Sequence, residues 1–151
     1  MTYSLQAILL MTCIVSPIFA VEKFTNGEKL FALKLKPLFA QKCLACHGDE
    51  PEKIKSKFDM RSRESMIRGG EIFENEVLIP SQGNQSFLYF LTTRKKKDLE
   101  MPPKEADKLS EEETWWVRDW IDAGAPWPSE EKIARIQAVS YTHLRAHETS
   151  T

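Results

Sequence analysis

The segment KCLACHGD, residues 42–49, places two cysteines and one histidine close together in the chain. Between residues 21 and 138, Cys43 and Cys46 are the only cysteines and His47 is the only histidine. Such a cluster can attach a haem, bind a zinc ion or act as a redox dithiol. Each use needs different residues elsewhere in the chain, so this cluster constrains the fold more than any other feature of the sequence.

Two of these uses find little support in the rest of the sequence. A structural zinc ion takes four ligands, usually from two pairs that lie far apart in the chain. The cluster supplies three at most, and residues 21–138 contain no second pair of cysteines or histidines. A redox Cys-x-x-Cys pair usually opens a helix after a strand in a βαβ unit. No strand–helix–strand pattern surrounds Cys43 and Cys46.

The spacing of the cluster fits covalent attachment of a haem. Cys-x-x-Cys-His is the attachment pattern of c-type haem, in which the two sulfurs add to the two vinyl groups of the porphyrin. The next residue can then direct its imidazole at the iron. We therefore predict one haem c per chain, attached to Cys43 and Cys46, with His47 as an iron ligand.

An iron bound through one histidine has a second axial position, for which three methionines compete in residues 21–138. Met101 lies in EMPPKE, where two consecutive prolines fix φ and stiffen the loop. Met60 and Met66 lie in FDMRSRESMIRGG, where we expect an ordinary packing role. We predict Met101 as the second iron ligand, and the alternative is an open or differently ligated site.

Helical periodicity predicts an all-α domain, because no alternating strand pattern appears anywhere in the chain. In residues 28–43, we expect Pro37 to break one helix and to start another in its first turn. Ser110 and Glu113 form a capping-box pattern at the start of a helix that Gly124 ends. The apolar residues at helical spacing in these two segments are Phe31, Leu35, Leu38, Phe39, Trp116, Val117, Trp120 and Ile121.

Two shorter helices are expected between these segments. One carries Met66 and Ile67 and is ended by Gly69–Gly70. The other lies in GNQSFLYFLTTRKKK, is capped near Asn84 and turns three apolar residues inward. These inward residues are Phe87, Leu88 and Leu91.

The two ends of the chain need separate treatment. Residues 1–20 resemble a signal peptide, because an uncharged, mostly apolar run from Leu5 to Ile18 is followed by the small residue Ala20. If this segment stays uncleaved, residues 5–18 are a possible membrane anchor. Residues 139–151 read as a sequencing-adaptor artefact, because codons for Val139 to Thr149 resemble a transposase adaptor, and the alternative is a natural polar tail. We therefore expect a domain at 21–128 and the start of a linker to a further region at 129–138.

Taken together, the chain resembles class I cytochromes c, and more closely the planctomycete-type cytochrome c domain. Five segments carry this resemblance: LKPLFAQKCLACHG, KFDMRSRESMIRGG, VLIPSQGNQSFLYF, MPPK and LSEEETWWVRDWIDAGAPW. The resemblance implies a small helical domain wrapped around one covalent haem, with His47 proximal and Met101 distal. It also implies that such a domain often opens a longer exported protein. The segment GGEIFENEVLIPSQGN is more acidic and bulkier than is usual for this family.

The function expected from this pattern is one-electron transfer by an electron carrier rather than catalysis, although a downstream region could hold an enzyme. We expect a dry aromatic pocket to favour ferrous iron, with four residues as candidate contributors to the core around it; for each of them the alternative is ordinary packing. They are Phe39, Phe87, Trp116 and Trp120. The alternative is a haem-based sensor or ligand-binding module that regulates a downstream domain.

The expected partner is an unidentified redox protein. A net charge of −1 gives no indication of nucleic-acid binding. Two basic runs, one at Arg94–Lys97 and the other at Lys53, Lys55 and Lys57, are candidates for docking an acidic partner. The signal-like start predicts export to the periplasm or cell envelope.

Overall fold

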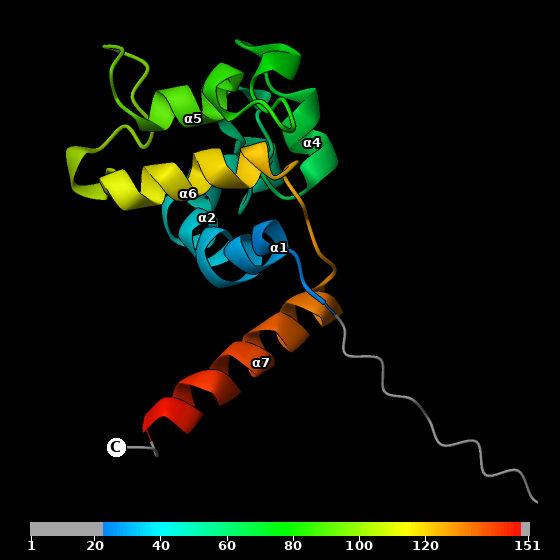
Figure 1. The fold of residues 1–151 in the computed structure, drawn as a ribbon. Coiled ribbons are helices and arrows are strands. Elements are labelled where there is room, and N and C mark those ends of the chain that lie inside the picture. Colours follow the sequence, from blue (N-terminus) through cyan, green and yellow to red (C-terminus); the bar gives the residue numbers. More distant parts are fainter. Residues whose placement is uncertain (1–22, 149–151) are drawn as a thin grey trace, which may run out of the picture.

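The computed structural model describes residues 23–148 and shows an all-helical domain, with no strand among these residues. Figure 1 shows α6 (Glu111–Asp122) across the middle of the domain, between α5 (Phe87–Thr92) on one side and α2 (Lys36–Lys42) on the other. The helix α7 (Glu130–Glu148) leads away beneath α1 (Asn26–Leu30). The predicted all-α fold is therefore confirmed.

The first helical segment is continuous where a break was predicted. Between α1 and α2 the chain forms one π-helical stretch, η1 (Phe31–Leu35), in which the N–H of Lys36 donates to the carbonyl of Phe31. Pro37 has no N–H, and in a regular α-helix its ring would crowd the carbonyl four residues earlier. The wider π turn relieves this conflict without ending the helix. The prediction that Pro37 lies in the first turn of α2 is confirmed.

The other predicted helices are present, with one error at a boundary. Ser110 caps α6 through a capping box with Glu113, and Gly124 follows the helix with a φ of +90°. The helix α4 (Arg63–Arg68) ends at Gly69, whose φ is +76°. The helix predicted to be capped near Asn84 begins two residues later, because Asn84 lies in the 3₁₀ turn η5 (Gly83–Gln85) and the N-cap of α5 is Ser86.

Short elements connect these helices. The attachment cluster forms the single turn α3 (Leu44–His47). The 3₁₀ turns η2 (Pro51–Lys53) and η3 (Lys55–Lys57) lie before α4, and η4 (Glu74–Glu76) lies after it. A last 3₁₀ turn, η6 (Glu105–Asp107), lies between the Met101 loop and α6.

An aromatic cluster under α6 forms the centre of the core. Trp120 is fully buried, and its ring lies 5.8 Å from the ring of Phe31 and 5.8 Å from that of Phe39. Trp127 lies against the same cluster, with 4.4 Å between its ring centroid and that of Phe31. The indole N–H of Trp120 donates to the carbonyl of Pro126 at 2.9 Å, so the only polar atom of this large side chain is satisfied.

The helix α7 covers residues for which a linker and an adaptor-derived tail were predicted. Its residues Ile133 and Ile136 are buried, and Lys132 pairs with Glu28 of α1 at 2.6 Å. The proposed origin of residues 139–151 and the boundary between 128 and 129 stay predictions. The signal-like segment, with its possible anchor at residues 5–18, lies outside the described residues, and no helix within 23–148 is long and apolar enough to cross a membrane.

Candidate haem site

The attachment cluster forms a tight turn directly after α2. The helix α2 ends at Cys43, whose φ of −121° interrupts the helical path. The carbonyl of Cys43 then accepts hydrogen bonds from the N–H groups of Cys46 at 3.1 Å and His47 at 3.0 Å. This turn places all three side chains on the wall of one cleft. A Cβ on Gly48 would lie only 2.8 Å from the Leu44 side chain. Gly48, which directly follows the turn, therefore packs closely against Leu44.

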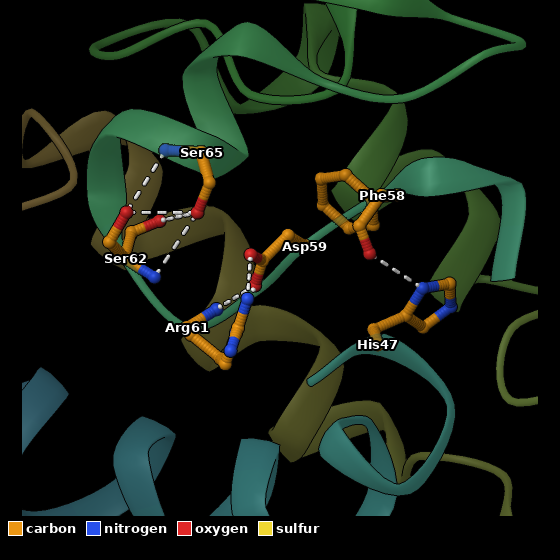
Figure 2. A network of polar contacts seen from close by, with 6 residues as sticks. All are labelled: His47, Phe58, Asp59, Arg61, Ser62 and Ser65. Atoms are coloured by element: carbon orange, nitrogen blue, oxygen red, sulfur yellow. Dashed lines mark hydrogen bonds and ion pairs between the residues drawn. The ribbon is translucent and has the colours of Figure 1, made fainter. Parts of the chain in front are cut away.

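The imidazole of His47 is oriented by a backbone carbonyl. Its Nδ1 atom lies 3.0 Å from the carbonyl oxygen of Phe58, and the ring of Phe58 packs edge-on at 5.4 Å (Figure 2). A carbonyl can only accept, so Nδ1 carries the proton and Nε2 keeps its lone pair. Burial lowers the pKa of His47, which favours the neutral ring that a metal requires.

The segment that carries Phe58 is itself fixed at several points. The N–H of Met60 donates to the carbonyl of His47 at 2.8 Å, so this segment runs directly beside the attachment turn. The guanidinium of Arg61 holds both carboxylate oxygens of Asp59, at 3.0 and 2.8 Å, and its hydrogen bonds lower the pKa of Asp59 (Figure 2). Such contacts around a ligand fix its ring orientation and tautomer.

The cleft beside the attachment turn has an empty volume of about 870 Å³, counted with the solvent at its mouth. Its charged lining residues are Lys42 and Glu71, and each is paired: Lys42 with Glu113 at 3.1 Å and Glu71 with Lys57 at 2.7 Å. The other walls are predominantly apolar. The apolar side chains are Phe58, Met60, Ile72, Phe73, Val77, Leu88, Leu91, Leu99, Met101, Pro102 and Pro103.

The predicted distal residue lines the same cleft as the attachment cluster. Met101 follows α5 in a loop, and its N–H donates to the carbonyl of Leu91 at 3.1 Å. Pro102 after it is buried, as expected for a loop that holds its shape. The attachment turn, with Cys43, Cys46 and His47, and the loop of Met101, which lies far away in the sequence, thus line one cleft.

A second thioether also reaches the cleft. Met60 was expected only to pack in the core, and it is indeed buried, with 2% of its surface exposed, but it also lines the cleft. Its backbone is bonded to His47, whereas that of Met101 is bonded to Leu91 at the end of α5. The two methionines are therefore anchored to different parts of the cleft wall. Met66 is fully buried and does not line the cleft.

None of the four aromatic residues expected around the pocket lines the cleft, which agrees with the alternative of ordinary packing. Phe39 and Trp120 belong to the core cluster beneath α6, and neither Phe87 nor Trp116 lines the cleft. The aromatic rings at the cleft are those of Phe58 and Phe73, the second of which stacks on Phe87 with 4.0 Å between centroids. Helical periodicity finds buried faces, and it cannot say which buried face meets a cofactor.

The residues of the cleft fit a haem better than the two alternative uses. Two thiols, an imidazole with a free Nε2 and a thioether face an apolar cleft, which is the donor set of a c-type haem. Within residues 23–148, no three His, Cys, Asp or Glu side chains converge as a metal site of their own. Burial raises the pKa of the Cys43 thiol to about 12, whereas a redox dithiol needs a lowered one.

An all-helical fold, a Cys-x-x-Cys-His turn on an apolar cleft and a methionine on the same cleft define the cytochrome c class. In agreement with this, residues 43–105 match the family model described as planctomycete cytochrome C. This stretch, from the first attachment cysteine to just beyond the Met101 loop, is a planctomycete-type cytochrome c domain. Such domains generally bind haem and carry electrons. Neither the comparison with curated proteins nor that with solved structures found a match.

Proposed function

We propose that this chain is an exported cytochrome c domain that transfers single electrons to and from another redox protein. In this proposal Cys43 and Cys46 attach one haem through thioether bonds, and His47 and Met101 are its axial ligands. The observation that carries the proposal is the convergence of these four residues on one apolar cleft. The haem, when bound, supplies a one-electron couple between ferrous and ferric iron.

The residues of the cleft have separate tasks in this function. The hydrogen bond from His47 Nδ1 to Phe58 fixes the tautomer of the imidazole, and burial, which lowers the pKa of His47, favours its neutral form. The thioether of Met101 favours the reduced state, because a His–Met ligand pair raises the reduction potential. The apolar walls act in the same direction, because a dry environment disfavours the additional positive charge of the oxidised site.

The proposed exchange changes no bond of a substrate. One electron enters from a reduced partner and leaves to an oxidised one. His47 and Met101, as iron ligands in both redox states, would limit the rearrangement of the site when its charge changes. The exposed Lys95–Lys97 run and the lysines around Ser56, which itself lines the cleft, are candidates for docking that partner.

Export is part of the proposal because haem attachment of this kind takes place outside the bacterial cytoplasm. The signal-like residues 1–20 support it from the sequence alone. We propose the periplasm or cell envelope as the location.

An absorption spectrum tests the proposal. The full chain would be produced in a host that exports it and has c-type maturation machinery, and spectra would be recorded in both redox states. Haem that stays with the protein after acid–acetone extraction, with a low-spin reduced spectrum, is the expected result. Extractable haem, or none, would contradict covalent attachment.

The same spectrum separates the electron carrier from the sensor alternative. A sensor needs an open or labile sixth position, and its ferrous form would be high-spin and would bind carbon monoxide at once. The presence of Met101 on the cleft wall favours the electron carrier.

A further inference from the structure

The side chain of Arg94 turns inward at the base of the Met101 loop. Arg94 follows α5 closely, has a φ of +56° and exposes 19% of its side chain, whereas Lys95–Lys97 beyond it are exposed. The basic run that the sequence presents as one unit therefore has two parts. Its first member faces the protein, and the other three face solvent.

The guanidinium of Arg94 connects two points of the loop. One nitrogen, Nη1, donates to the carbonyl oxygen of Pro102, the residue directly after Met101. The other, Nη2, donates to a carboxylate oxygen of Glu105 at 3.1 Å. Glu105 also pairs with Lys108 at 2.6 Å. This pair connects the Arg94–Glu105 contact to the segment that leads into α6.

These contacts close the loop on both sides of Met101. On one side the N–H of Met101 donates to the carbonyl of Leu91, and on the other Arg94 holds the carbonyl of Pro102. The planar guanidinium can donate in both directions at once, which a lysine cannot do with the same geometry. A hydrogen bond from a charged donor changes an equilibrium by roughly 10- to 100-fold.

We propose that Arg94 is a positioning residue that keeps the thioether of Met101 at the iron. This inference rests on the proposed function, in which Met101 is the distal ligand. Without Arg94, the carbonyl of Pro102 loses its charged donor and the loop is held at Met101 by the Leu91 contact. The sixth position then opens more often to an external ligand.

The test is a titration of the haem-loaded ferric protein with imidazole, followed by absorbance. Imidazole competes with Met101 for the iron, so its apparent affinity reports how often the thioether is released. For Arg94→Met we expect the affinity to rise roughly 10- to 100-fold. For Arg94→Lys, which keeps the charge and one hydrogen bond, we expect a smaller rise.

Arg63 offers a matched control. Its guanidinium also donates to backbone carbonyls, those of Ala125 at 2.8 Å and Gly124 at 3.1 Å, but it does not line the cleft. Arg63→Met should lower the melting temperature and leave the imidazole affinity unchanged. If Arg94→Met and Arg63→Met behave alike in the titration, Arg94 has only a structural role and the inference is wrong.

A third variant keeps the inference distinct from the proposed function. Met101→Ala should bind imidazole far more tightly than the wild type. If it does so while both Arg94 variants match the wild type, the positioning role of Arg94 alone is overturned. If Met101→Ala also matches the wild type, Met101 is not the distal ligand, and the proposed site fails together with the inference. Should Arg94→Met not fold, Arg94→Gln, which also removes the charged donor, takes its place, and no rise in its imidazole affinity would overturn the role.

Discussion

The Nδ1 atom of His47 lies 3.0 Å from the carbonyl oxygen of Phe58, which follows it by eleven residues. A carbonyl only accepts, so this contact places the proton of the neutral imidazole on Nδ1 and leaves the lone pair on Nε2. Because Met60 in the same segment donates to the carbonyl of His47, the segment holds both the ring and the backbone of the ligand. Contacts within the chain thus orient the attachment turn without any contribution from a cofactor.

The two methionines of the cleft should differ in their effects on the haem. For Met101→Ala we expect loss of the low-spin spectrum, because the distal thioether is removed. For Met60→Ala we expect the spectrum to stay low-spin and the free energy of unfolding to fall by about 2–5 kcal/mol, the usual range for a buried methionine. Absorption spectra and denaturant titrations of the two variants check this. If Met60→Ala loses the low-spin spectrum and Met101→Ala keeps it, Met60 is the distal ligand.

The stacked rings of Phe73 and Phe87 give a second matched pair. Both lose the same stacking contact when replaced by alanine, which is worth about 0.5–1.5 kcal/mol beyond the buried area. Only Phe73 lines the cleft, so Phe73→Ala admits water near the iron and should lower the reduction potential. Phe87→Ala should lower it less. Redox titration of both variants measures the difference in reduction potential. Equal shifts in potential would contradict a role of Phe73 in keeping water from the iron.

The parts of the fold that the sequence predicted well depend on neighbours in the chain. The capping box of Ser110 and Glu113 spans three residues, and the Gly69 end of α4 depends on one backbone angle. The Cys43–His47 turn was found in the same way, from its spacing. In each case the residues that decide the structure lie within one helical turn of one another.

The parts that could not be predicted depend on contacts between distant elements. Pro37 was expected to break a helix, but burial of the flanking apolar residues keeps the chain helical through a π turn. Trp120 was a candidate for the pocket, but it packs against Phe31 and Trp127 and does not line the cleft. The partner of His47 was missed because a backbone carbonyl carries no mark in the sequence.

The ion pair between Glu28 and Lys132 should make stability depend on pH. Its side chains are only 16% and 26% exposed, and the hydrogen bond from Lys132 is the main cause of the lowered pKa of Glu28. A carboxylate with a lowered pKa in the folded state stabilises the fold above its unfolded pKa of about 4.3. This contribution is lost as the pH falls through the lower, folded value.

We therefore expect unfolding experiments between about pH 6 and pH 3 to show a loss of stability that Glu28→Gln reduces. The control is Glu131→Gln on α7, the helix of Lys132, since Glu131 is 81% exposed and pairs with Arg135 at the surface. Exposed pairs contribute little to stability, so this variant should follow the wild type. If both variants follow the wild type, α7 is not held to α1 through this pair.

The exposed lysines should control the rate of electron exchange with charged reactants. Reversal of Lys95–Lys97 to glutamate should slow the oxidation of the ferrous protein by hexacyanoferrate(III), an anion, several-fold at low ionic strength. The same reversal of Lys53, Lys55 and Lys57 is the comparison, because Ser56 between them lines the cleft. We expect the larger change in rate from the lysine run that lies nearer to the place where the electron leaves the haem.

Salt distinguishes this electrostatic effect from damage to the fold. The Debye length falls from about 10 Å at 0.1 M to about 3 Å at 1 M, so the rates of all variants should converge at high salt. Since Arg94 is left intact, the Met101 loop keeps its inward contact with Pro102. A difference that persists at 1 M salt would mean that the substitutions had altered the site itself, and no difference at any salt concentration would remove both runs as docking candidates.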